Sequence, residues 1–115
     1  MANINVPFPK VYTLPAVQEH VKQVCEALEW DKLSNEKTFL MFIEEVGELA
    51  KAMRKIDKLA LEKNKPVDSD EALQHNLKEE FADVLNYLLD LANRYGVDLE
   101  TSYRMKMEDN LQRKW

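Results

Sequence analysis

Residues 39–56 have the sequence FLMFIEEVGELAKAMRKI and set the architecture that the rest of the chain follows. Apolar side chains recur there at spacings of three and four residues, which is the period of an α-helix. They cover a wider arc than the apolar stripe of an ordinary surface helix. These apolar positions are Phe39, Leu40, Phe42, Ile43, Val46, Leu49, Ala50, Met53 and Ile56. The stretch therefore predicts a long helix whose apolar side chains are covered on more than one side by other helices of the same chain or of a second copy.

Helical spacing also precedes this stretch and continues beyond it. A first helix is predicted over residues 15–29, because Pro15 suits the first turn of a helix. The second helix is predicted over residues 34–62, with Ser34 or Asn35 as its N-cap. Few breakers interrupt these segments, since the chain contains only 2 glycines.

Two further helices are predicted in the second half of the chain. The segment 64–68 breaks the helical period, and a third helix is expected over residues 70–95. Gly96 stands where a left-handed C-cap belongs. Asp98 can then cap a fourth helix that runs towards Trp115. No strand pattern is found, so we expect an all-α fold, a four-helix bundle.

The chain of 115 residues is expected to form a single helical domain, residues 15–115, after an extended arm, residues 1–14. The arm contains two prolines and shows no helical period. A helix of about 25 residues spans about 38 Å at 1.5 Å per residue, which is long for so small a monomer. Its broad apolar arc needs cover from elsewhere, so a homo-oligomer is predicted to complete the bundle.

The composition excludes several classes of protein. A net charge of −5, with 16 basic residues interleaved among 21 acidic ones, argues against a nucleic-acid partner. No apolar run approaches the roughly 20 residues that a membrane span needs. No secretory signal is recognised at the N-terminus. Cys25 is the one cysteine and cannot form an internal disulfide, so a cytoplasmic location is expected.

Two carboxylate clusters stand out within the apolar helices. Glu45 and Glu48, which follow Glu44, share one face of the second helix, and Glu80 and Asp83 share one face of the third. If the two helices pack antiparallel, these four side chains converge at a half-buried seam. Such convergence is repulsive without a cation. Magnesium prefers oxygen ligands and binds through a few carboxylates together with substrate phosphates.

An ordinary solvated face is the alternative for each cluster, because Glu is a good helix former. Each cluster alone favours that alternative, whereas two clusters that both interrupt apolar stretches also suit a metal site. The pattern leaves both interpretations open. Gly47 costs about 1 kcal/mol in the middle of a helix, so we expect a neighbour to approach it closely.

The fourth helix carries a polar stripe. Lys106, Asn110 and Arg113 follow one another at helical spacing, with Leu99 and Tyr103 on the same side. Two cations and an amide in a row can hold phosphate oxygens by charge and hydrogen bonds. The alternative is an amphipathic helix with a basic polar edge, and the pattern alone favours it.

Three motifs in this order resemble the MazG-like family of all-α nucleoside triphosphate pyrophosphohydrolases. The first is E-E-x-x-E at residues 44–48, the second is E-x-x-D at 80–83, and the third is K-x-x-x-N-x-x-R at 106–113. The resemblance spans roughly residues 17–113. It implies magnesium, with manganese as a possible substitute, bound by Glu45, Glu48, Glu80 and Asp83.

The resemblance also assigns roles to other residues. Glu44 is expected beside the metal to position water, and either Glu44 or Glu45 is expected to accept the proton. Lys106, Asn110 and Arg113 are expected to hold the phosphate chain. Tyr87 and Trp30 are expected to line the nucleotide pocket, with buried core contacts as the alternative for both.

The implied reaction splits a (deoxy)nucleoside triphosphate between its α and β phosphates, giving monophosphate and pyrophosphate. Cleansing of the nucleotide pool is the implied role, and a homodimer or a dimer of dimers is the implied assembly. Specificity for phosphoribosyl-ATP, dUTP or dCTP stays open. A non-catalytic helical oligomerisation module is the alternative from another class. A di-iron bundle is disfavoured, because neither His20 nor His75 follows a Glu by three residues.

Overall fold

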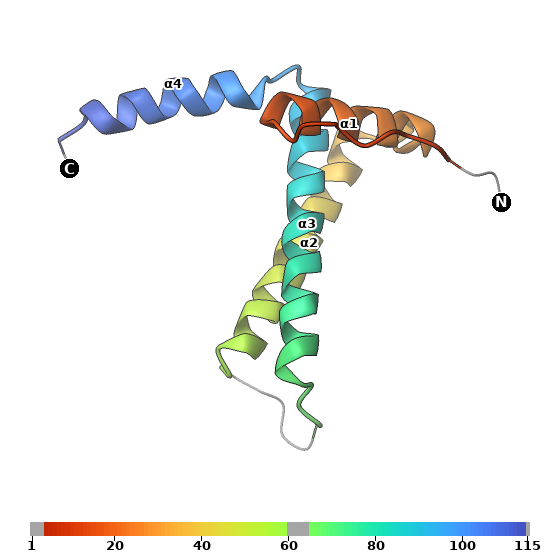
Figure 1. Cartoon of the computed structure of the whole chain (residues 1–115), viewed down its shortest axis with the longest axis vertical. Coiled ribbons are helices and arrows are strands. Elements are labelled where there is room, and N and C mark those ends of the chain that lie inside the picture. Colours follow the sequence, from red (N-terminus) through yellow and green to blue (C-terminus); the bar gives the residue numbers. More distant parts are fainter. Residues whose placement is uncertain (1–3, 60–64, 115) are drawn as a thin grey trace. The chain divides into compact units, whose positions relative to one another are not determined.

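The computed structural model describes residues 4–59 and 65–114. Figure 1 shows the helices in chain order. They are α1 (Leu14–Ala27), the 3-10 turn η1 (Trp30–Lys32), α2 (Asn35–Ile56), α3 (Asp70–Arg94) and α4 (Leu99–Gln112). The described residues contain no strand. The prediction of an all-α chain with four α-helices is therefore confirmed.

The described residues form two compact units. We call residues 36–88 the hairpin unit and residues 4–35 with 89–114 the terminal unit. The hairpin unit is continuous in sequence, whereas the terminal unit is built from both ends of the chain. None of the helices in the described segments is long and apolar enough to cross a membrane.

The hairpin unit consists of α2 and the larger part of α3, which lie side by side and antiparallel (Figure 1). Its buried side chains are few, and Thr38, Ala52 and Leu73 are among them. Many large apolar side chains stay exposed, between 39% for Val46 and 65% for Leu40. The others on α2 and α3 are Phe39, Ile43, Met53, Phe81, Leu85 and Leu88. The single chain thus leaves much of the apolar arc of α2 without cover.

The terminal unit has a small core in which Val21, Cys25 and Leu89 are buried, with Val17 and Leu99 packed against them. Val17, Val21 and Cys25 follow one another at a spacing of four residues, which places them on one face of α1. Residues 4–13 contain no helix or strand before α1 begins at Leu14.

Gln18 connects α1 to the turn between α3 and α4. Its side-chain amide donates to the Val97 carbonyl at 2.6 Å, and its side-chain oxygen accepts from the Leu99 N–H at 3.2 Å. The Asn93 side chain donates to the Gln18 carbonyl at 3.0 Å. Gln18 is buried, and these bonds satisfy polar groups that would be costly to bury alone.

The C-terminal ends of α2 and α3 use the same backbone geometry. Gly96 has φ +66°, and the Val97 N–H donates to the Ala92 carbonyl at 2.9 Å. This closing bond identifies a Schellman motif, so the predicted cap at Gly96 is confirmed. Lys58 has φ +56°, and the Leu59 N–H donates to the Arg54 carbonyl at 2.9 Å.

Three predictions about the helices were wrong. The second helix was expected to run on to about residue 62, but α2 ends at Ile56 because Lys58 adopts the left-handed conformation. The first helix was expected to reach Glu29, but α1 ends at Ala27 and Glu29 has φ +60°. The fourth helix was expected to run towards Trp115, but α4 ends at Gln112 because Arg113 has an extended backbone. Residues 62 and 115 themselves lie outside the described residues.

The expected close approach at Gly47 is not found among residues 4–59 and 65–114. A Cβ atom placed on Gly47 would meet nothing within 4 Å. No described side chain of the same molecule therefore explains why glycine occupies this position.

Candidate metal centre

Three of the four predicted metal ligands lie together in the hairpin unit. Glu45 comes from α2, while Glu80 and Asp83 lie one turn apart on α3. One carboxylate oxygen from each lies within 4.8 Å of the other two. The antiparallel pairing of α2 and α3 thus brings together side chains that are 35 or more positions apart in the sequence.

The electrostatics of the cluster act most strongly on Glu45. The pKa of its carboxyl is raised, first because the group is partly removed from water and next because Asp83 is negatively charged. A hydrogen bond with the Glu80 side chain, the charge of Glu80 and the charge of Glu48 raise that pKa further. The cluster therefore favours bound positive charge, either a proton or a cation.

One atom of the cluster lacks a partner. Glu80 Oε2 is buried and accepts no hydrogen bond from the part of the chain that the structure describes. A buried carboxylate oxygen without a donor is costly, and a cation removes that cost. A group of three carboxylates that includes this oxygen suits a hard divalent cation, which takes oxygen ligands. The residues present therefore fit a divalent metal.

Glu48 and Glu44 stand apart from this group. Both side chains are exposed, and neither belongs to the three that share the 4.8 Å cluster. Glu48 is still near enough for its charge to raise the pKa of Glu45. The metal-binding role of Glu48 and the catalytic role of Glu44 stay predictions.

The two predicted pocket aromatics lie in different units. Tyr87 is half-buried in the hairpin unit, two helical turns after Glu80 on α3. Trp30 lies in η1 of the terminal unit with 42% of its surface exposed, so it is not a core residue of the single chain.

Arg94 holds the backbone around Trp30, and sequence reasoning missed it. Its guanidinium donates to the carbonyl of Trp30 at 2.8 Å, to the carbonyl of Leu33 at 2.6 Å and to Asn35 Oδ1 at 3.3 Å. It also pairs with Asp90 at 3.1 Å, with both side chains about nine-tenths buried. An acid and an Arg four residues apart on a largely apolar helix face were the available signal.

The polar stripe of α4 is partly neutralised within its own helix. Asp109 forms ion pairs with Lys106 at 3.8 Å and with Arg113 at 3.0 Å. The side-chain amide of Asn110 lies 4.0 Å from the Met107 sulfur. This helix belongs to the terminal unit, so its role at the carboxylates stays a prediction.

Comparison with known families agrees with these motifs. The MazG nucleotide pyrophosphohydrolase domain matches residues 33–114, which include α2, α3 and α4. No curated protein matches the chain. The matched range covers well over half of the chain and contains all three motifs, so the resemblance seen in the sequence is confirmed. The chain belongs to the family of the MazG nucleotide pyrophosphohydrolase domain.

Proposed function

We propose that this protein is a magnesium-dependent enzyme that hydrolyses (deoxy)nucleoside triphosphates between the α and β phosphates. Its products are a nucleoside monophosphate and pyrophosphate. The observation that carries the proposal is the meeting of Glu45, Glu80 and Asp83 from two helices. Membership of a family that acts on nucleotides, generally with a divalent metal, supports it.

In this proposal Glu45, Glu80 and Asp83 hold Mg²⁺, and Glu48 adds a ligand from the next turn of α2. Mn²⁺ can take the same oxygen ligands. When bound, the metal neutralises phosphate charge and lowers the pKa of water. Glu44 is exposed and precedes Glu45 in the sequence, and we assign its carboxylate to position the attacking water and accept its proton, with Glu45 as the alternative acceptor.

Other predicted residues complete the proposed substrate site. Lys106, Asn110 and Arg113 hold the phosphate chain by charge-assisted hydrogen bonds. Tyr87 and Trp30 face the nucleoside. The exposed apolar side chains of α2 and α3 support a homodimer or a dimer of dimers, because a monomer would leave them in water. Cleansing of the nucleotide pool in the cytoplasm is the proposed role.

A nucleotide screen tests the proposal. The purified full chain is incubated with a panel that includes dUTP, dCTP and phosphoribosyl-ATP, in magnesium, in manganese and in chelator. Pyrophosphate and orthophosphate are measured separately. We expect pyrophosphate without orthophosphate in the presence of metal, and neither product in chelator.

Matched variants then test the site. Asp83→Asn and Glu48→Gln are expected to abolish turnover with an unchanged circular-dichroism spectrum, because each removes a ligand rather than core volume. Glu79→Gln is the control, since this exposed neighbour on α3 pairs only with His75 in the described residues. Near wild-type activity in both ligand variants would refute the site. A folded oligomer that cleaves no nucleotide would favour a non-catalytic oligomerisation module.

A further inference from the structure

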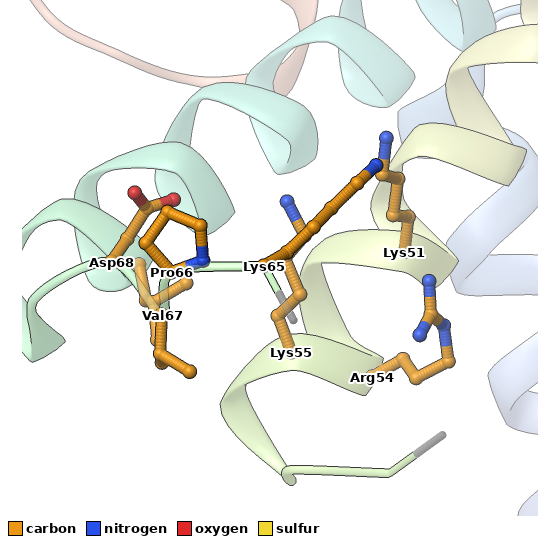
Figure 2. Close-up of a pocket in the computed structure, with 8 residues that line it drawn as sticks. Lys51, Arg54, Lys55, Lys65, Pro66, Val67 and Asp68 are labelled. Carbon is orange, nitrogen blue, oxygen red and sulfur yellow. The ribbon is translucent and has the colours of Figure 1, made fainter. Parts of the chain in front are cut away.

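A concave site lies in the hairpin unit, towards the C-terminal end of α2 (Figure 2). It is a cavity of about 130 Å³. Its walls come from α2, from the segment that leads into α3, and from the first turns of α3. The lining residues are Lys51, Arg54, Lys55, Lys65, Pro66, Val67, Asp68 and Leu73.

The lining of this basic pocket carries four cations and one carboxylate. The whole chain has a net charge of −5, so the pocket locally reverses the charge of the protein. Figure 2 shows the side chain of Lys65 extending towards Lys51, although the two residues come from different segments. This local excess of positive charge attracts an anion.

The cations stand beside apolar walls. Leu73 is buried, and Pro66 and Val67 line the same space. Arg54 and Lys55 are half-buried. Contact with apolar walls lowers the local dielectric constant, so an anion there interacts more strongly than it would on an open surface.

Two of these cations form no ion pair within the described part of the chain, although Asp68 lines the same cavity. The ammonium groups of Lys51 and Lys55 make no hydrogen bond or ion pair there. Arg54 is fixed at the edge of the cavity, because its Nη1 donates to the Leu59 carbonyl at 3.4 Å. Because the cations of the lining outnumber its one carboxylate, they repel one another on balance, and a bound oxyanion reduces that repulsion.

The pocket lies beyond the carboxylate cluster along α2. It begins at Lys51, six residues or about 9 Å after Glu45 and one turn after Glu48, and it extends to Lys55, about 15 Å after Glu45 at 1.5 Å per residue. On α3, Leu73 likewise precedes Glu80 by about two turns. The two places occupy successive stretches of the same pair of helices.

We propose that this basic pocket is an anion site that binds a phosphate group other than those held at the carboxylate cluster. Phosphate oxygens accept charge-assisted hydrogen bonds from Lys and Arg, and the guanidinium of Arg54 suits their geometry. The group can be a second phosphate of the nucleotide substrate, or it can belong to a separate ligand such as inorganic pyrophosphate. Both sources share this chemistry.

Calorimetric titration of the full chain with inorganic pyrophosphate tests the proposal. Chelator is present, so neither metal nor turnover contributes, and failure of the proposed enzymatic function leaves this result unaffected. We expect the wild type to bind pyrophosphate. In Lys51→Gln/Lys55→Gln, affinity should fall about 100-fold, roughly tenfold for each charge-assisted hydrogen bond that the substitutions remove.

Lys10→Gln/Lys78→Gln is the matched control, because it removes two exposed lysines outside the pocket and changes the net charge equally. Thermal melts establish that both double variants are folded. Equal affinity in all three proteins, or no binding by the wild type, overturns the proposal. Repeating the titration with magnesium and a saturating non-hydrolysable nucleoside triphosphate distinguishes the sources. Competition identifies a phosphate of the substrate, and undiminished binding identifies a separate ligand.

Discussion

The carboxylates of Glu45, Glu80 and Asp83 repel one another, since oxygen atoms of all three lie within 4.8 Å. The pKa of Glu45 is raised from its usual 4.5, so the folded protein holds its proton at pH values where the unfolded chain has lost it. Stability in the absence of metal therefore falls as the pH rises above about 4.5 through the raised pKa. At neutral pH the metal-free site opposes folding.

Asp83→Asn is accordingly expected to raise the melting temperature of the metal-free protein at pH 7, because it removes one of the repelling charges. Saturating magnesium should stabilise the wild type, by about 2.7 kcal/mol at 100 times its dissociation constant, and should leave this variant almost unchanged. Thermal melts with magnesium and with chelator measure both effects. Glu79→Gln, on the same helix, should behave like the wild type. A variant that melts lower in chelator and keeps the magnesium shift would contradict the assignment.

Cys25 provides a second test at a single side chain. It is 3% exposed, and burial together with the nearby charge of Asp90 raises the pKa of its thiol from 9.0 to about 11. The native protein should therefore react with a thiol reagent at pH 8 at least about 100-fold more slowly than the urea-unfolded chain. Stability should also fall as the pH rises from 9 towards 11. Equal labelling rates in the native and unfolded states would exclude a buried thiol.

The helices differ in how well the sequence predicted their ends. Gly96 was recognisable as a left-handed cap because glycine adopts positive φ at little cost. Lys58 adopts φ +56° without that signal, and apolar residues beyond it continue the helical period, so the predicted α2 was too long. The turn at Trp30 depends on Arg94, which lies 64 positions away. The residues next to Trp30 in the sequence therefore do not predict this turn.

Within α4, Asp109 competes with substrate for the cations of the predicted phosphate stripe. Lys106→Ala is expected to raise KM about tenfold with little change in kcat, since one charge-assisted hydrogen bond is worth about 1.5–3 kcal/mol. Asp109→Asn should lower KM, because it removes the ion pairs that Asp109 forms with Lys106 and Arg113. Steady-state pyrophosphate release with the best nucleotide of the panel measures both.

Arg104→Ala is the control on the same helix. Arg104 is an exposed cation that pairs with Glu100 at 3.1 Å, outside the stripe. An unchanged KM and kcat in Lys106→Ala would count against the phosphate role of α4.

We expect the protein to be a homo-oligomer in solution. Leu40 and Phe81, 65% and 54% exposed, belong to the wide apolar surface of the hairpin unit. Analytical ultracentrifugation should find a dimer or a tetramer. Phe81→Asp should weaken association roughly 30-fold or more if its side chain contributes about 2 kcal/mol. Val11→Asp, in the exposed arm, should leave association unchanged. A monomeric wild type would overturn the prediction.

Periodicity predicted the all-α class and the meeting of Glu45 with Glu80 and Asp83, because spacing along two antiparallel helices determines which side chains share a face. It could not separate Glu48 from that group, since residues three positions apart share a broad helix face and the spacing does not show which way each side chain turns. It also missed the basic pocket. Lys65 joins that pocket from the segment between α2 and α3, where no periodic pattern exists.

The division of the chain into a continuous and a discontinuous unit has a consequence for biosynthesis. Residues 36–88 contain every segment of the hairpin unit, so that unit can assemble as soon as this stretch has left the ribosome. The terminal unit must wait, because the hydrogen bonds of Gln18 with Val97 and Leu99 join residues 79 and 81 positions apart. During translation α1 therefore emerges before α3 and α4 and acquires its contacts with them last, and until then the nascent chain leaves Val21 and Cys25 without their partners Leu89 and Leu99.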